Sequence, residues 1–242
     1  MTQLRNKNIA CSYADGTLRI IKIKNKNGYE DIQLIKKAHS TYITTIIELK
    51  NGNIITFSLD SSFKIWKLNN NNQYEKNYEF KDTNKLSDGL EIKDNEIILY
   101  SIATSPSSLA FYNLNQNAKI KTLNNLNLFI NDLGKRIIRI NNDKIALAGS
   151  GSIYLIDILN YLILNEIKSD ATNSCILKLS NNLFLTGESN GGITQYRIVN
   201  RKLIKESFKN KSHEERIVSL VLLNDMIISG SDKNQEIKIW KI

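Results

Sequence analysis

The most regular feature of the chain is a short stretch of alternating apolar and polar residues that recurs every 40 to 46 residues. Side chains that alternate with a period of two are typical of a β-strand with one covered face. Six such stretches occur: Thr17–Ile23, Ser62–Leu68, Ser108–Leu114, Ser152–Ile158, Gly192–Ile198 and Glu236–Ile242. Their spacing indicates six copies of one structural unit.

Further strand signals lie inside each unit. In the second unit, the β-branched stretch 43–49 is followed by Asn51-Gly52, a pair typical of a tight hairpin turn. Residues 54–58, 62–68 and 73–80 then supply three more strands. Four strands and short turns in each unit leave little room for helix, so the sequence predicts an all-β fold.

Both tryptophans and both histidines occupy equivalent positions of the repeat. Trp66 and Trp240 lie in the two closely similar stretches FKIWKL and EIKIWKI. His39 lies 27 residues before Trp66, and His213 lies 27 residues before Trp240. Because every His and Trp falls into the same two positions, we expect these side chains to be structural and not catalytic.

The second and sixth units resemble the repeat of the WD-repeat β-propeller family. That repeat has a His before the first strand, a Ser or Thr in the second, an Asp in the next turn and a Trp in the third. The matching residues are His39, Thr56, Asp60 and Trp66, and again His213, Ser229 and Trp240, with Asp232 or Asn234 as the acid of the sixth unit. In the family these side chains form a hydrogen-bonded chain, so the resemblance implies a structural tetrad here.

The resemblance implies one domain, residues 1–242, folded as a β-propeller of about six four-stranded blades. The units end near residues 23, 68, 114, 158, 198 and 242. The match is weak in the third and fourth units, and the fifth has Thr186 and Asn190 but Tyr196 in place of Trp. The first unit begins with the tail of a strand and the last stops after its third strand, so we expect the first and last blades to be incomplete. Either six blades close with shortened sheets, which we favour, or the chain is part of a longer propeller.

Charge and composition add a second candidate surface. The formal net charge is +9, and one basic sector contains Arg201, Lys202, Lys205 and Lys209. Such a sector can attract nucleic acid or acidic proteins. We favour a different explanation, in which the sector consists of solvated lysines that protect an outer strand edge. The abundance of Asn, Ile and Lys also suits compositional bias.

The sequence offers no set of residues for catalysis. Both histidines lie in the structural position, and the two cysteines, Cys11 and Cys175, are far from a zinc-binding spacing. The glycine pairs 149/151 and 191/192 do not form a phosphate-binding loop. We therefore predict no enzyme activity, no cofactor and no metal.

Composition also bears on where the chain works. We expect both cysteines to be buried and unpaired, which fits a reducing compartment. There is no apolar run of transmembrane length and no signal-peptide pattern at the N-terminus. These features predict a cytoplasmic protein, with a nuclear location left open.

The loops of the predicted propeller are where we expect binding, because loops on a rigid frame suit recognition. In the family the usual docking face carries the turns before the first strand and after the second. The corresponding candidates here are Tyr42, Lys135 and Arg216, with Ser105 and Pro106 in the extended loop 101–108. That loop is either a specificity element or a harmless extension.

Three functional hypotheses follow. We favour a scaffold or adaptor that binds a protein or peptide and forms a subunit of a larger complex. The alternative is a propeller associated with nucleic acid or ribonucleoprotein through the basic sector. An enzyme on a propeller frame has the least support, because no catalytic residues can be named.

Overall fold

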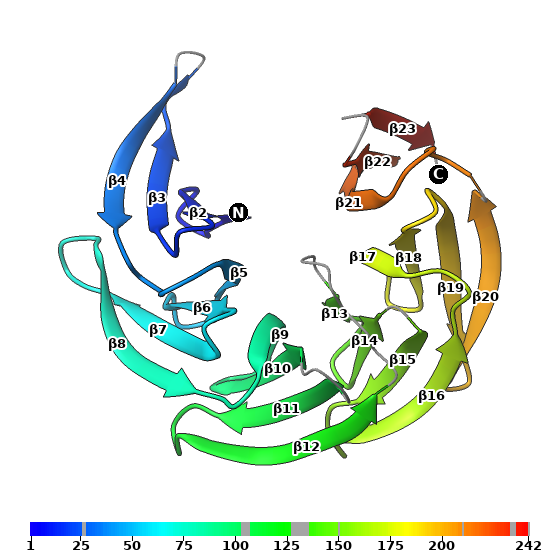
Figure 1. The fold of residues 1–242 in the computed structure, drawn as a ribbon, viewed down its shortest axis with the longest axis horizontal. Coiled ribbons are helices and arrows are strands. Elements are labelled where there is room, and N and C mark those ends of the chain that lie inside the picture. Colours follow the sequence, from blue (N-terminus) through cyan, green and yellow to red (C-terminus); the bar gives the residue numbers. More distant parts are fainter. Residues whose placement is uncertain are drawn as a thin grey trace. The chain divides into compact units, whose positions relative to one another are not determined.

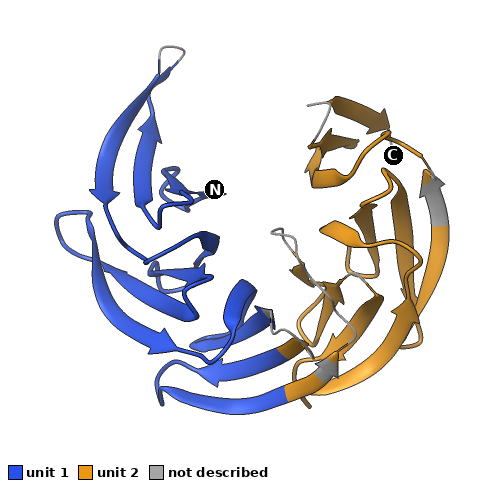
Figure 2. Cartoon of the chain, viewed as in Figure 1, with its two compact units in different colours: residues 1–103, 109–122 blue, residues 104–108, 123–242 orange. Residues whose placement is uncertain are grey.

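The computed structural model describes residues 1–25, 28–102, 107–126, 136–149, 151–209, 211–232 and 236–241. The chain divides into two compact units (Figure 2). The first unit comprises residues 1–103 and 109–122, and the second comprises residues 104–108 and 123–242. Each unit is built from antiparallel sheets in which strands consecutive in the chain lie side by side (Figure 1).

The first unit holds three four-stranded sheets. The first sheet consists of β1 (Thr2–Gln3), β2 (Ile9–Ser12), β3 (Leu18–Ile23) and β4 (Tyr29–Ile35). The second consists of β5 (Ile43–Glu48), β6 (Ile54–Ser58), β7 (Ser62–Leu68) and β8 (Tyr74–Lys81). The third consists of β9 (Lys85–Lys93), β10 (Glu96–Ile102), β11 (Ser107–Asn113) and β12 (Ala118–Leu126). The first two residues of β11 and the last four of β12 belong to the second unit.

The second unit continues the same pattern. The fourth sheet consists of β13 (Ile137–Arg139), β14 (Lys144–Ala148), β15 (Ser152–Asp157) and β16 (Leu162–Lys168). The fifth consists of β17 (Asn173–Ser180), β18 (Leu183–Glu188), β19 (Ile193–Val199) and β20 (Lys202–Lys209). The sixth has three strands among the described residues, namely β21 (Ile217–Leu223), β22 (Met226–Ser231) and β23 (Ile237–Lys241).

These sheets confirm the predicted all-β fold of six units, and the described residues contain no α-helix. The last sheet lacks a fourth strand in the described part of the chain, and β1 has only two residues. None of the described residues forms a helix long and apolar enough to cross a membrane.

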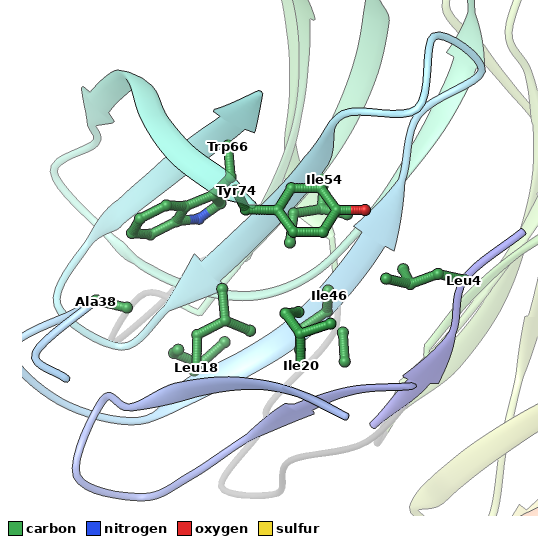
Figure 3. Close-up of a cluster of buried hydrophobic side chains, with 10 residues drawn as sticks. Leu4, Leu18, Ile20, Ala38, Ile46, Ile54, Trp66 and Tyr74 are labelled. Carbon is green, nitrogen blue, oxygen red and sulfur yellow. The ribbon is translucent and has the colours of Figure 1, made fainter. Parts of the chain in front are cut away.

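The core lies where neighbouring sheets within a unit pack face to face. Figure 3 shows the cluster between the first and second sheets, in which Leu18 and Ile20 of β3 face Trp66 of β7 and Ile54 of β6. A second cluster joins the second and third sheets around Phe57, Phe63 and Leu99. The alternation seen along the sequence therefore results from strands that present every second residue to a neighbouring sheet.

The turns and cysteines follow from the same local chemistry. Gly52 adopts a φ of 87°, which glycine tolerates in the hairpin between β5 and β6. Both cysteines are free thiols. Cys175 is buried as predicted, whereas the prediction is wrong for Cys11, which is only half-buried.

Candidate functional site

The four predicted tetrad residues of the second sheet form a continuous hydrogen-bonded chain. The indole N–H of Trp66 donates to Thr56 Oγ1 at 2.9 Å, and Thr56 Oγ1 lies 2.7 Å from His39 Nε2. His39 Nδ1 donates to Asp60 at 2.9 Å. The chain links β6, β7 and the segment before β5, so each buried polar atom has a partner.

The chemistry of this chain favours a neutral histidine. Burial lowers the pKa of His39, although Asp60 opposes that shift. A neutral imidazole with its proton on Nδ1 can accept a hydrogen bond from Thr56 at Nε2. Because both ring nitrogens are hydrogen-bonded and the residue is buried, the environment of His39 is that of a structural residue.

Asp60 accepts several hydrogen bonds from neighbouring protein groups. Burial opposes its ionisation, but hydrogen bonds from Ser62 and the Ser40 amide, with His39, lower the pKa of Asp60 to about 2. The ionised carboxylate therefore anchors the turn between β6 and β7 to the loop before β5.

This shift predicts a defined pH dependence of stability. The folded-state pKa of Asp60 lies below its usual value of 3.8, so the stabilisation is present above about pH 4 and is lost as the pH falls toward 2. We expect Asp60→Asn to lower the free energy of unfolding by about 2 kcal/mol at pH 6. Urea titrations of both proteins at several pH values should show that difference shrinking toward pH 2.5. A difference that does not change with pH would contradict the assignment.

The sixth sheet forms a similar chain with a different acid. Trp240 donates to Ser229 Oγ at 2.8 Å, and Ser229 Oγ lies 2.6 Å from His213 Nε2. His213 Nδ1 donates to Glu236 at 3.0 Å. The sequence-based choice of Asp232 is therefore wrong, and Asn234 lies outside the described residues. Asp232 instead accepts a hydrogen bond from Arg216 Nε at 2.9 Å.

A lysine two residues before each tryptophan completes both arrangements. Lys64 Nζ donates to the carbonyl oxygen of Ala38 at 2.6 Å, and Lys238 Nζ donates to that of Ser212 at 2.8 Å. Both carbonyls immediately precede the tetrad histidine. Sequence reasoning missed this role, although the shared Lys-Ile-Trp-Lys tetrapeptide was a visible signal.

The third sheet reaches the same connection with other residues. The Asp82 amide donates to the carbonyl of Ser61, just as the His39 amide donates to that of Gly16, so Asp82 occupies the histidine position. The Tyr112 hydroxyl donates directly to Asp82 at 2.9 Å. A two-residue link therefore replaces the four-residue chain.

The fifth sheet relies more on packing. Tyr196 stacks on Phe184 with ring centroids 5.3 Å apart, and Asn190 accepts a hydrogen bond from the Gly192 amide within its turn. Thr186 is buried in β18. The fifth sheet thus joins β18 and β19 through an aromatic contact in place of the tetrad.

A polar hollow of about 570 Å³ opens beside the tetrad of the second sheet. Its lining consists of Asp15, Lys37, His39, Ser40, Asp60, Ser62, Lys64, Glu79 and Lys81. The carboxylates are largely engaged within the protein, since Asp60 binds Ser62 and Glu79 lies 3.2 Å from Lys76. Two of its lysines, Lys37 and Lys81, are exposed.

The predicted partner-binding residues differ in how accessible they are. Tyr42, in the first unit, exposes 46% of its surface two residues after Ser40 of the hollow. Arg216, in the second unit, forms an ion pair with Asp232 at 2.6 Å and is less available than expected. Lys135, Ser105 and Pro106 lie outside the described residues.

The predicted basic sector is partly neutralised. Lys205 pairs with Asp170 at 3.3 Å, and the neighbouring Arg197 binds Glu206 at 2.7 Å. Lys209 Nζ lies 5.7 Å from the centre of the Trp240 ring. Arg201 and Lys202 remain exposed. Within the described ranges, no group of three or more His, Cys, Asp or Glu side chains is arranged to hold a metal.

Comparison with solved structures decides the fold. A chain in the crystal structure of a mitotic checkpoint complex is similar over 100% of this chain and 73% of its own length, with a TM-score of 0.82 and 8% identity. Sqt1 of Saccharomyces cerevisiae is similar over 97% and 68%, with a TM-score of 0.77 and 14% identity. The computationally designed protein Ika8 is similar over the same shares, with a TM-score of 0.69 and 13% identity. This chain is a β-propeller.

The six sheets are its blades, and the last blade has three strands among the described residues. The propeller is similar to the WD-repeat type, as the repeated tetrad residues implied. No known protein family and no curated protein sequence matches the chain. At identities of 8 to 14%, the likeness extends to the fold alone.

Proposed function

We propose that this propeller is a non-enzymatic adaptor that binds a protein or peptide through the loops beside the tetrad of its second blade. The proposal rests on which polar side chains are engaged inside the protein and which are exposed. Both histidines are buried and hydrogen-bonded at both ring nitrogens, whereas Tyr42, Lys37 and Lys81 stay exposed. Such an arrangement supports recognition and leaves no histidine for proton transfer.

The chemistry of the hollow indicates what it would accept. Two exposed lysines beside an exposed tyrosine suit a peptide with an acidic side chain, because tyrosine supplies contact area and lysine supplies charge. One of the similar structures is a chain in a complex of several proteins, by its description. An adaptor of this kind would work as a subunit of a larger intracellular assembly, and we propose the cytoplasm as its compartment.

The experiment is a capture of partners by the whole chain, followed by affinity measurement with the identified partner. We expect Tyr42→Ala combined with Lys37→Glu and Lys81→Glu to weaken binding roughly tenfold or more, because few side chains dominate an interface. Lys121→Glu, a charge reversal on the exposed face of β12, is the matched control and should bind normally. Circular dichroism and melting temperature confirm that each variant is folded.

The nucleic-acid alternative depends on the basic sector. It predicts that reversing Arg201, Lys202, Lys205 and Lys209 abolishes binding and that binding weakens steeply with salt. The ion pair of Lys205 with Asp170 reduces the free charge of that sector. A partner lost with these four reversals but retained by the triple variant of the hollow would overturn the adaptor site.

A further inference from the structure

One backbone contact recurs in four of the connections between consecutive blades. In each, an amide donates to a carbonyl in the turn between the second and third strands of the preceding blade. The four donors are His39, Asp82, Ser169 and His213, and their acceptors are Gly16, Ser61, Gly151 and Gly191. The residue that follows the donor therefore occupies an equivalent position in each connection.

This position holds either an acidic residue or a residue with a hydroxyl group. In chain order it is Ser40, Thr83, Asp170 and Glu214, and all four are exposed. Asp170 pairs at 3.3 Å with Lys205 of β20, the fourth strand of the blade that follows. The fold thus accepts a negative charge at this position, and a lysine of a fourth strand can neutralise it.

Ser40 and Thr83 differ in how their hydroxyl groups are engaged. Thr83 Oγ1 donates to Asp82 at 3.2 Å. Ser40 Oγ lies 3.5 Å from Asp60 Oδ2, which is long for a hydroxyl hydrogen bond. The amide of Ser40 donates to the same carboxylate at 3.0 Å. The backbone of Ser40 is therefore held in place, whereas its hydroxyl group is accessible.

The surroundings of Ser40 contain positive charge that the protein itself does not use. The hollow that Ser40 lines also contains the three lysines Lys37, Lys64 and Lys81. Lys64 lies 3.7 Å from Glu79. Lys37 and Lys81 are exposed, and neither forms a hydrogen bond or ion pair with another residue of the described ranges. An anionic group on Ser40 would thus have two lysines to pair with.

We propose that Ser40 is a phosphorylation site whose phosphate lies in the hollow, paired with Lys37 and Lys81. A protein kinase transfers the γ-phosphoryl group of ATP to Ser40 Oγ, the O–H bond breaks with release of its proton, and ADP leaves. The exposed pair Lys36-Lys37 precedes the serine, and kinases select substrates by charge patterns of this kind. The Asp60 carboxylate repels the phosphate, so the phosphate turns away from the tetrad toward the lysines.

The modification regulates the adaptor, a consequence that rests on the function proposed above. A phosphate carries up to two negative charges, so it neutralises both lysines and fills part of the hollow. We expect the phosphorylated chain to bind the captured partner at least roughly tenfold more weakly than the unmodified chain. Ser40→Ala should abolish this response, so that kinase treatment no longer changes its affinity.

The position of the phosphate can be tested without a partner. Phosphoserine is incorporated at position 40 of the whole chain, and ³¹P NMR follows its titration. We expect the second pKa of the phosphate to fall from about 6 to about 5 on folding, because the lysines favour the dianion. The carboxylates of Asp15, Asp60 and Glu79 line the same hollow and oppose this change, so a lower pKa requires direct pairing with lysine. The same protein unfolded in urea is the reference.

Lys81→Gln separates the folded hollow from the local sequence. Lys81 ends β8 and is far from Ser40 along the chain. If the phosphate lies in the hollow, this substitution should return its pKa toward the value measured in urea. Melting temperature shows that the phosphorylated variants are folded.

Kinase mapping tests the modification itself. The whole chain is incubated with ATP and a kinase that selects basic residues before serine, and the modified residues are mapped by mass spectrometry. We expect phosphate at Ser40 in preference to Thr83, whose hydroxyl group is bonded to Asp82. Lys36→Gln combined with Lys37→Gln should slow the modification several-fold.

Three results would overturn the proposal: modification of other exposed serines but not of Ser40, a phosphate pKa that is equal in the folded and unfolded chain, or a lowered pKa that Lys81→Gln leaves unchanged. The last result would assign the shift to the neighbouring lysines at positions 36 and 37. Failure of the proposed function is distinguishable, because the titration of the phosphate needs no partner.

Discussion

Trp66→Ala should lower the free energy of unfolding by about 3–5 kcal/mol, as expected for emptying the site of a large buried side chain. Trp66 is 4% exposed and packs against the first blade in the cluster of Figure 3. The substitution also removes the N–H that donates to Thr56. Thr56 in turn contacts His39, so we expect the hydrogen bond between Thr56 and His39 to weaken as well. Chemical denaturation of the whole chain measures the effect.

Two further variants separate packing from hydrogen bonding. Trp66→Phe keeps most of the apolar volume but loses the donor, so we expect a smaller cost of about 1–2 kcal/mol. Trp240→Ala removes the same side chain from the open sixth blade, where the indole is only half-buried, and should cost less than Trp66→Ala. Equal losses in the free energy of unfolding at both tryptophans would show that burial between blades does not determine the size of the effect.

Gly16→Ala should destabilise the chain by roughly 3 kcal/mol, from backbone strain and a steric clash together. Gly16 adopts a φ of 79°, and its carbonyl accepts the amide of His39. A Cβ at this position would overlap the carbonyl oxygen of His39. The loop before β5 would have to move, and the tetrad histidine would move with it.

Gly52→Ala is the matched control for that strain. Gly52 also has a positive φ, of 87°, but an added Cβ meets nothing within 4 Å. Its cost should stay near 1–2 kcal/mol, the usual price of a left-handed non-glycine residue. If thermal melts show the two variants to be equally destabilised, the close approach of Gly16 to His39 has no energetic role.

The fold was predictable because its information is local and repeated. Each blade contains its own alternating strands, and the third strands end at Ile23 and Leu68 in the first two blades, where the sequence pattern ends. The Asn51-Gly52 pair marks a turn without any knowledge of tertiary contacts. Six copies of such signals made the all-β architecture clear even where a single copy was weak.

The composition of the tetrads was harder to predict, because different residues satisfy the same geometry. Glu236 lies at the end of the connection between β22 and β23, later in the chain than the position at which an acid was expected, yet its side chain reaches His213. Asp82 replaces a histidine because Tyr112 extends its hydroxyl far enough to need no intermediate. Position in the repeat defines the connection, whereas residue identity follows from side-chain length.

The candidate binding surface was the least predictable part. Tyr42, a candidate for partner binding, is exposed, whereas Arg216 is held by Asp232, a residue 16 positions away along the chain. The hollow between the first two blades combines Asp15 with Glu79, and no local pattern relates two residues so far apart in sequence. Surfaces assembled from several loops require the folded chain.

The position of Glu236 has a consequence for engineering. In the second blade the acid that holds the histidine is part of the β6–β7 turn, so the length of that turn is constrained. In the last blade the acid directly precedes β23, and Asp232, at the start of the connection between β22 and β23, binds Arg216 instead. Substitutions at positions 232 and 236 should therefore act on different contacts, because Asp232 binds Arg216 whereas Glu236 binds the tetrad histidine.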